Sequence, residues 1–471
     1  MNTKKLSELC VFVVQIKYGQ MKTSILFILI LTGICLIGNF PVQAQIGRRF
    51  PSERKVLKDP VTGTELTFLT STPAGDSKIY QTHNQWTCDS EWLIFRSDRV
   101  KDEAMAVNEK SGEIVQVTEG GYTGMLNVAR KSMKLYFMRK PKVESETKSL
   151  DIVEVDLANL FADSKSGKLK PESTYQRICG STPPEWEAGG DMALDGDEQW
   201  VWFRVGRTEA QKHLPEGTKM EEAFGPRKMG AGPAGIAGMN IRTGEKKYVV
   251  SVPFQVGHIQ TNPWVPGQII FCWETGGKSP QRTWLVNSDG TGLRPLYPES
   301  TYEWVTHEAV ISPDEVAFAI MGHRKIPNTS TGGELGTDVK GANPGQEAAW
   351  GPSGTREKPT GLGIVNINTR EMILAGQIPF GSGFWHVNGT ADKRFVAGDD
   401  FARNLYLIDR NIHEMILLTT GHKTTAADHP HPTFSPDGTR IEIQSAMLSE
   451  DNKSMNICIV PLPEAWLKRK N

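Results

Sequence analysis

The chain has 471 residues, with 53 Lys and Arg against 54 Asp and Glu, and 38% of its residues are hydrophobic. This balance removes the sequence-independent attraction on which nucleic-acid-binding proteins rely, so we expect no nucleic-acid partner. Length alone suggests two or three domains. That rule fails for repeat architectures, in which one domain grows by repetition.

Residues 1–44 have the composition of a targeting segment. Met21-Lys22 is followed by an apolar run from Ile25 to Ile37 and by the small-residue site Val42-Gln43-Ala44. This order is typical of a secretory signal peptide. We expect translation to begin at Met21 and residues 45–471 to form a periplasmic or secreted protein. No later apolar run approaches the roughly 18 residues that span a membrane, so we expect no membrane span in the mature chain.

A unit of two strands separated by a loop recurs seven times after residue 86. Its first strands are Trp92–Phe95, Leu135–Phe137, Trp200–Phe203, Ile269–Phe271, Val316–Phe318, Phe395–Ala397 and Ile441–Ile443. Its second strands are Ala104–Val107, Ile152–Val155, Ala237–Ile241, Trp284–Val286, Leu362–Val365, Leu405–Ile408 and Ile457–Val460. Alternating strands repeated at intervals of roughly 40 to 80 residues are typical of propeller blades. The sequence predicts an all-β fold, a single seven-bladed β-propeller domain over residues 45–471, closed by pairing of Glu65–Leu69 with Ile457–Val460.

Histidines recur at one place in these units, a few residues before the polar turn that precedes a blade strand. The five are His83, His258, His307, His386 and His431. Because a propeller brings equivalent positions to one channel, we expect these imidazoles to share a pocket. The alternative for each one alone is a half-buried histidine bonded to neighbouring backbone. We expect the remaining loop histidines at the surface, namely His213, His323, His413 and His422.

The segment His429-Pro430-His431-Pro432 has the spacing of a pair of metal ligands. In an extended strand, residues i and i+2 point the same way, and a proline favours an extended conformation for the residue before it. An exposed loop without a role is the alternative. Three neutral imidazoles that converge on an open site suit a divalent cation such as Mn²⁺ or Zn²⁺ better than Ca²⁺, which prefers oxygen ligands.

Four segments resemble the oligogalacturonate lyases, seven-bladed propeller enzymes that cleave uronic-acid oligosaccharides by β-elimination. They are Val256–Glu274, Arg282–Gly290, Thr306–Asp314 and His429–Asp437, which together represent the C-terminal half of the chain. The resemblance implies that His258 is the Brønsted base and that His307, His429 and His431 bind a divalent metal. We expect Mn²⁺ first, with Zn²⁺ and Ca²⁺ as alternatives.

The chain departs from this family at two places. Ala426 stands where the family has a metal-binding Gln, so His386 or Asp428 is a candidate to complete the metal shell. A substrate-binding Arg expected in the third blade is also missing, near Gly235 and Ala237. We therefore expect a uronic-acid glycan as the partner, with rhamnose–glucuronate and ulvan-type chains as candidates beside oligogalacturonate.

For substrate binding we single out His83, Arg282, Arg324 and Trp385, and we note Arg403 as a further candidate. Arginines hold carboxylates by paired hydrogen bonds. Tryptophans near the same turns could stack on sugar rings or pack inside a blade: Trp86, Trp264, Trp273 and Trp304.

A non-catalytic periplasmic propeller of the TolB or WD-repeat kind is the alternative function. Five equivalent histidines favour an enzyme, because a binding propeller has no reason to place imidazoles at matched channel positions. A glycoside hydrolase needs a pair of carboxylates. The nearest pair, Asp399 and Asp400, is expected to cap a turn.

Overall fold

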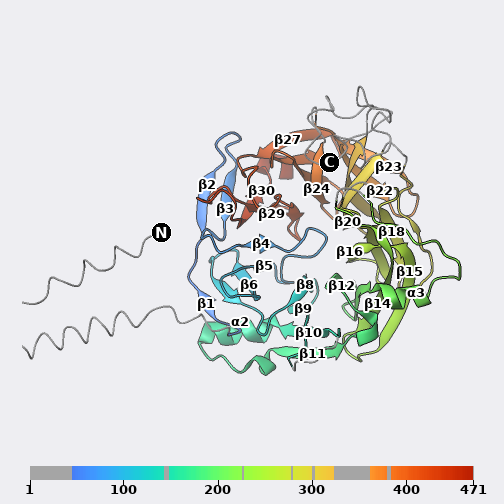
Figure 1. Ribbon diagram of the computed structural model, residues 1–471. Coiled ribbons are helices and arrows are strands. Elements are labelled where there is room, and N and C mark those ends of the chain that lie inside the picture. The colour runs from blue at the N-terminus through green and yellow to red at the C-terminus, as the bar shows by residue number, and fades with distance from the viewer. Residues whose placement is uncertain are drawn as a thin grey trace, which may run out of the picture. The chain divides into compact units, whose positions relative to one another are not determined.

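The computed structural model describes residues 45–142, 148–224, 227–276, 279–299, 303–322, 361–378 and 383–469. Over these residues the chain forms seven antiparallel sheets, which Figure 1 shows arranged around a common centre. The predicted all-β fold, a seven-bladed β-propeller, is confirmed. The expected signal segment, His323 and Arg324 lie outside the described residues.

The first four sheets follow one another along the chain, and each runs from the channel outward. The first contains β4 (Ser77–Lys78), β5 (Trp92–Arg96), β6 (Ala104–Asn108), β7 (Ile114–Gln116) and β1 (Arg49–Phe50). The second contains β8 (Thr123–Val128), β9 (Lys134–Arg139), β10 (Asp151–Asp156) and β11 (Gln176–Ser181). The third contains β12 (Met192–Leu194), β13 (Trp200–Val205), β14 (Ala231–Asn240) and β15 (Lys246–Phe254). The fourth contains β16 (Val256–Thr261), β17 (Gln268–Trp273), β18 (Thr283–Asn287) and β19 (Arg294–Pro295).

Three further sheets complete the ring. The fifth contains β20 (Glu303–Ser312), β21 (Glu315–Gly322), β22 (Gly361–Asn366) and β23 (Met372–Gly376). The sixth contains β24 (Phe384–Gly389), β25 (Phe395–Asp400), β26 (Leu405–Asp409) and β27 (Glu414–Thr419). The seventh contains β28 (Thr433–Phe434), β29 (Arg440–Ser445), β30 (Asn456–Pro461), β3 (Glu65–Phe68) and β2 (Lys55–Lys58).

Among the described residues, helices are few and short. They are α2 (Leu157–Ser166), α3 (Arg207–Lys212) and α4 (Glu464–Leu467), with 3₁₀ turns η1 (Glu172–Thr174) and η2 (Pro184–Trp186). In the described part of the chain, none of the helices is long and apolar enough to cross a membrane.

The core lies between neighbouring sheets. Each sheet packs against a neighbour on both faces, so its middle strands are apolar on both sides rather than alternating. The side chains of Trp92–Phe95 in β5 are all buried, as are those of Ile269–Trp273 in β17. These middle strands are the seven pairs that the repeat predicts. The innermost strands are more polar and line the channel.

Strands from near both ends of the described chain pair in the seventh sheet. Strand β3 pairs with β30, with Thr67 opposite Ile459 and Phe68 opposite Cys458. Figure 1 shows the blue strands β2 and β3 beside the red strands β29 and β30. The predicted closure of the ring by Glu65–Leu69 is therefore confirmed.

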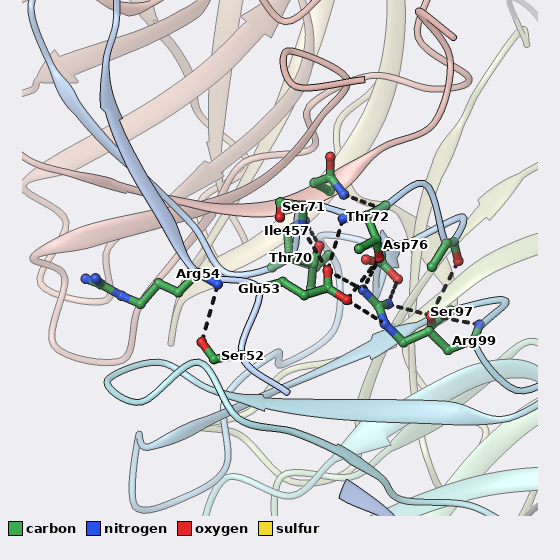
Figure 2. A network of polar contacts seen from close by, with 12 residues as sticks. Ser52, Glu53, Arg54, Thr70, Ser71, Thr72, Asp76, Ser97, Arg99 and Ile457 are labelled. Carbon is green, nitrogen blue, oxygen red and sulfur yellow. Dashed lines mark hydrogen bonds and ion pairs between the residues drawn. The ribbon is translucent and has the colours of Figure 1, made fainter. Parts of the chain in front are cut away.

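A buried ion network fastens the same junction, as Figure 2 shows. The guanidinium of Arg99, which follows β5, pairs with Glu53 at 2.7 Å and with Asp76. Glu53 also accepts two backbone N–H groups from the segment after β3. Beside it, the backbone N–H of Ile457 in β30 donates to the Thr70 hydroxyl at 3.0 Å. The first sheet, the seventh sheet and the N-terminal segment are thus held together by side chains as well as by strand pairing.

The expectation of a strand across His429–Pro432 is wrong. Strand β28 begins only at Thr433, and the backbone of His431 is left-handed, with φ +52°. Pro432 therefore does not hold His431 extended. The backbone of Pro430 instead accepts the N–H of Gln444 in β29 at 3.0 Å, which fixes the segment against the seventh sheet without a strand at this point.

His422 does not lie at the surface, contrary to the sequence expectation. Its side chain is buried, and both of its ring nitrogens have hydroxyl partners. Nε2 lies 2.6 Å from the Thr419 hydroxyl and Nδ1 lies 2.8 Å from the Ser445 hydroxyl. A histidine that satisfies both nitrogens in this way is stable inside a protein without a ligand.

Candidate active site

Backbone bulges determine where the side chains of two channel histidines, His258 and His307, point. His258 in β16 and His307 in β20 have φ values of +48° and +55°, and the pairing of each strand with its neighbour shifts register at that point. The corresponding shift in β8 is occupied by Gly124, with φ +73°. A bulge turns a side chain out of the regular alternation of the strand. A left-handed backbone costs a residue other than glycine on the order of 1–3 kcal/mol, so the surrounding strands must maintain it.

The redirected side chains line a cavity of about 460 Å³, which we call the histidine cavity. It is lined by the first halves of β16, β20 and β24, and its wall includes His258, His307, His386 and His431. Its volume lies within the roughly 300–1,000 Å³ that is typical of small-molecule sites. The expected shared pocket therefore contains four of the five matched histidines.

An imidazole cluster occupies one side of the histidine cavity. The ring centroid of His386 lies 4.1 Å from that of His307, 3.7 Å from that of His431 and 5.2 Å from that of His429. The structure thus brings together all four histidines that the sequence suggested as metal ligands. They come from the fifth sheet, the sixth sheet and the segment before the seventh.

Oxygen atoms face the Nδ1 atoms of three of these rings. Asp399 in β25 places one carboxylate oxygen 3.0 Å from Nδ1 of His429 and the other 3.3 Å from Nδ1 of His386. The Tyr80 hydroxyl lies 2.6 Å from Nδ1 of His307. An oxygen that accepts Nδ1–H leaves the Nε2 lone pair available, which is the usual arrangement around a metal-binding histidine.

His431 provides a fourth imidazole. Its Nε2 atom is buried and makes no hydrogen bond of full geometry with a described residue, while Asp428 Oδ1 lies 3.2 Å from it. Burial, with a nearby imidazole, lowers the pKa of His386 to about 3 and holds the pKa of His307 well below its usual value. His307 and His386 are therefore uncharged at neutral pH, as metal ligands must be. The set of imidazole donors, with Asp428 beside it, fits a divalent transition metal.

Ala426 contributes no donor to this cluster. Its methyl group packs against Ala446 and Met455. The additional imidazole comes instead from His386 in β24, held by Asp399. Both sequence candidates for completing the shell, His386 and Asp428, lie beside His431.

His258 lies apart from the imidazole cluster, with its ring centroid 6.3 Å from that of His307. Its Nε2 atom is 3.3 Å from Glu274 and its Nδ1 atom is 3.6 Å from Glu308. Burial alone would lower the pKa of His258, but the hydrogen bond to Glu308 and the charge of Glu274 raise it above the usual value. The surroundings of His258 thus favour its protonated form.

Arg282 supports this arrangement. Its Nε donates to Glu308 at 2.9 Å, and a second nitrogen lies 3.3 Å from Nδ1 of His258. Although burial would raise the pKa of Glu308, the neighbouring Arg282 guanidinium holds it at about 2. Arg282 therefore lies in the cavity wall with its guanidinium facing Glu308 and His258, and its binding of substrate stays a prediction.

Of the other predicted substrate-binding residues, some lie in the histidine cavity and others do not. Trp385 lines the histidine cavity, with its ring centroid 4.3 Å from that of His307. His83 does not line it, and its Nε2 atom lies 2.9 Å from the carbonyl oxygen of Met192. Arg324 is outside the described residues, and Arg403 contacts the carbonyl oxygen of Ala426 at 3.5 Å. Of the remaining tryptophans, Trp86, Trp273 and Trp304 are buried, whereas Trp264 is 37% exposed.

Sequence reasoning missed Tyr80 and the role of Asp399. Tyr80 follows a strand of only two residues, which gives no periodic signal. The expectation that Asp399 caps a turn is wrong, because its carboxylate faces two imidazoles. Asp400 does cap a turn, since it accepts the backbone N–H of Asn404 at 2.8 Å. The sequence does show two adjacent aspartates at the end of a buried strand. It does not show that Asp399 faces the imidazoles while Asp400 caps the turn.

No family model and no curated protein sequence matches the chain. Among solved structures, it is similar to an oligogalacturonate lyase in complex with manganese, with TM-score 0.65 and 18% identity over 90% of this chain and 100% of that chain. It is also similar to the oligogalacturonate lyase of Vibrio parahaemolyticus, with TM-score 0.65 and 17% identity over the same shares. Identity at this level shows the fold alone. The chain is a seven-bladed β-propeller that resembles the oligogalacturonate lyases in structure.

Proposed function

We propose that this protein is a lyase that cleaves a uronic-acid-containing glycan by metal-assisted β-elimination. One observation carries the proposal. A single cavity contains a histidine with a raised pKa between two carboxylates, and across from it a cluster of imidazoles with available Nε2 atoms. The first group suits proton abstraction and the second suits a cation, and elimination from a uronate needs both.

The residues that would hold the metal are His307, His386, His429 and His431, with Asp428 adjacent. The similarity to a lyase solved with manganese supports Mn²⁺ as the first candidate. When bound, a divalent cation would neutralise the substrate carboxylate and so stabilise the negative charge that develops at the neighbouring carbon. Asp399 and Tyr80 would orient the imidazoles through their Nδ1 atoms.

His258 would remove the proton from carbon 5 of the uronate in its unprotonated form. The electron pair of that C–H bond forms the double bond between carbons 4 and 5, while the bond from carbon 4 to the leaving oxygen breaks and that oxygen takes a proton from solvent. Glu274 and Glu308 would stabilise the imidazolium that His258 becomes. Arg282 would keep Glu308 ionised, and Trp385 offers an aromatic face to a sugar ring.

Two features support a substrate beyond plain oligogalacturonate. Ala426 replaces the expected Gln, and Gly235 and Ala237 occupy the part of β14 where an Arg was expected. Glucuronate linked to rhamnose and ulvan-type chains are therefore candidates beside oligogalacturonate. The signal-like segment Met21–Ala44 supports a periplasmic or secreted setting.

The proposal is tested by offering the purified protein a panel of uronic-acid glycans and following the ultraviolet absorbance of unsaturated uronate. We expect one class of glycan to give a steady rise in absorbance. His258→Ala should lose the rise, whereas His413→Ala, a change of an exposed histidine, should keep it. A protein that binds such a glycan without forming the unsaturated product would instead support the non-catalytic binding propeller.

A further inference from the structure

A second cavity lies at the other end of the channel. It has a volume of about 330 Å³ and is lined by the ends of β20 and β24 and by the turns that follow β24 and β28. We call it the turn-side cavity. The innermost strands run through the channel from one face to the other, so cavities at their beginnings and at their ends open on opposite faces. Tyr80 lines the histidine cavity and the next residue, Gln81, lines the turn-side cavity.

Gln81 lines this cavity and has a buried amide. The residue is only 2% exposed, and among the described residues neither atom of its amide makes a hydrogen bond of full geometry, although the Tyr80 hydroxyl lies near it. A buried polar group without a partner costs about 1–3 kcal/mol. The amide offers a donor and an acceptor side by side, which is the pattern that adjacent hydroxyl groups of a sugar satisfy.

Arg130 and Trp264 form another part of the wall. The guanidinium carbon of Arg130 lies 5.8 Å from the centroid of the Trp264 ring. The side chain of Arg130 is exposed and makes no ion pair within the described ranges, although the Glu198 carboxylate lies close enough to favour its charge. An exposed indole beside a guanidinium that makes no direct ion pair with a described carboxylate suits a sugar ring that carries a carboxylate.

The two acidic residues that line the turn-side cavity, Asp392 and Asp437, already make polar contacts within the chain. Asp437 pairs with Arg440 at 2.8 Å. Asp392 accepts the Thr390 hydroxyl at 2.5 Å and the backbone N–H of Arg394 at 3.0 Å. Their negative charge is thus directed into the turns, whereas the N–H groups of Arg130 make no hydrogen bond to a carboxylate in the described part of the chain. This difference favours an anionic ligand over a neutral one.

We propose that the turn-side cavity is a second carbohydrate site, which binds a carboxylate-bearing sugar unit through Arg130, Gln81 and Trp264. It uses no residue of the histidine cavity and does not depend on the elimination reaction. Such a site would retain an acidic glycan, or a product of its cleavage, on the face opposite the reacting centre.

The test is a ligand-observed NMR titration of the chelator-treated full chain with glucuronate and, in parallel, with glucose. We expect glucuronate to bind at least ten-fold more tightly than glucose. Arg130→Ala should weaken glucuronate binding at least ten-fold, whereas Arg242→Ala, a change of an exposed arginine outside both cavities, should leave it unchanged. His429→Ala should also leave it unchanged, because the binding does not involve the imidazole cluster.

Gln81→Met provides an independent variant that should fold. Because it removes a buried amide that makes no hydrogen bond of full geometry with a described residue and keeps the side-chain length, we expect its unfolding midpoint to equal or exceed that of the unchanged protein while glucuronate binding weakens. The proposal is overturned if the unchanged protein binds neither sugar or binds both equally. It is also overturned if Arg130→Ala binds glucuronate as tightly as the unchanged protein, or if Gln81→Met lowers the unfolding midpoint.

Discussion

His258 is the residue whose ionisation sets the expected pH dependence of elimination. A base must be unprotonated to act, and the pKa of His258 is raised. The acid limb of kcat/KM should therefore have its midpoint above the ordinary histidine value of about 6.5. Glu274→Gln removes a negative charge that favours the imidazolium, so the pKa should fall and the limb should move to lower pH. A pH profile of Glu274→Gln that coincides with that of the unchanged protein, or moves to higher pH, contradicts this role.

Replacing His258 separates proton abstraction from metal binding. His258→Ala should lower the elimination rate by a factor on the order of 10² or more, because general-base catalysis is lost. Its metal content should stay unchanged, since His258 lies outside the imidazole cluster. The measurement is a steady-state rate together with elemental analysis of the same sample. Near-normal turnover in this variant would show that another group takes the proton.

The imidazole cluster gives a graded prediction for metal content. His429→Ala should lose the bound metal and the activity with little change of fold. Asp399→Asn should keep the fold and weaken metal affinity about 10–100-fold, because Asp399 orients two ligands through Nδ1. Asp400→Asn is the matched control, since the neighbouring Asp400 caps a turn and should leave metal affinity unchanged. Equal metal affinity in Asp399→Asn and Asp400→Asn would show that Asp399 does not support metal binding.

At the scale of the strand, the left-handed bulges explain how the histidines leave the regular alternation. His307 has φ +55°, a conformation that strains alanine and suits glycine. In metal-free protein, His307→Gly should therefore be about 1 kcal/mol more stable than His307→Ala. Chemical denaturation of the two variants measures the difference. A more stable alanine variant would mean that residue 307 does not have the left-handed backbone conformation in solution.

At the junction of the first and seventh sheets, Arg99 offers a second test at this scale. Its removal leaves the Glu53 and Asp76 carboxylates without their cation in a buried setting. Arg99→Ala should lower the free energy of unfolding by about 3–5 kcal/mol. Lys468→Ala, which breaks an exposed ion pair with Glu464, should change it by less than about 1 kcal/mol. Similar losses in the two variants would show that the network does not fasten the ring.

At the scale of the whole molecule, the sequence predicted what repetition makes visible. The middle strands of the seven sheets, such as β5 and β17, are apolar on both faces and recur along the chain, so blade number and ring closure could be inferred. The innermost strands are short, polar or bulged, and gave no such signal. Four histidines could be grouped because they recur or belong to one motif. Tyr80 and Asp399 could not be placed, because only closure of the ring brings residue 80 beside residues 307 and 386.

Elimination is the central claim, and the masses of the reaction products test it most directly. The protein should be incubated with its preferred uronic-acid glycan, and the products analysed by mass spectrometry. Elimination predicts that each cleavage gives one fragment with an unsaturated uronate, lighter by one water molecule than the fragment that hydrolysis would give. It further predicts that a chelator prevents formation of this fragment and that Mn²⁺ restores it. Products with the masses expected for hydrolysis, or cleavage that a chelator does not affect, would contradict the account.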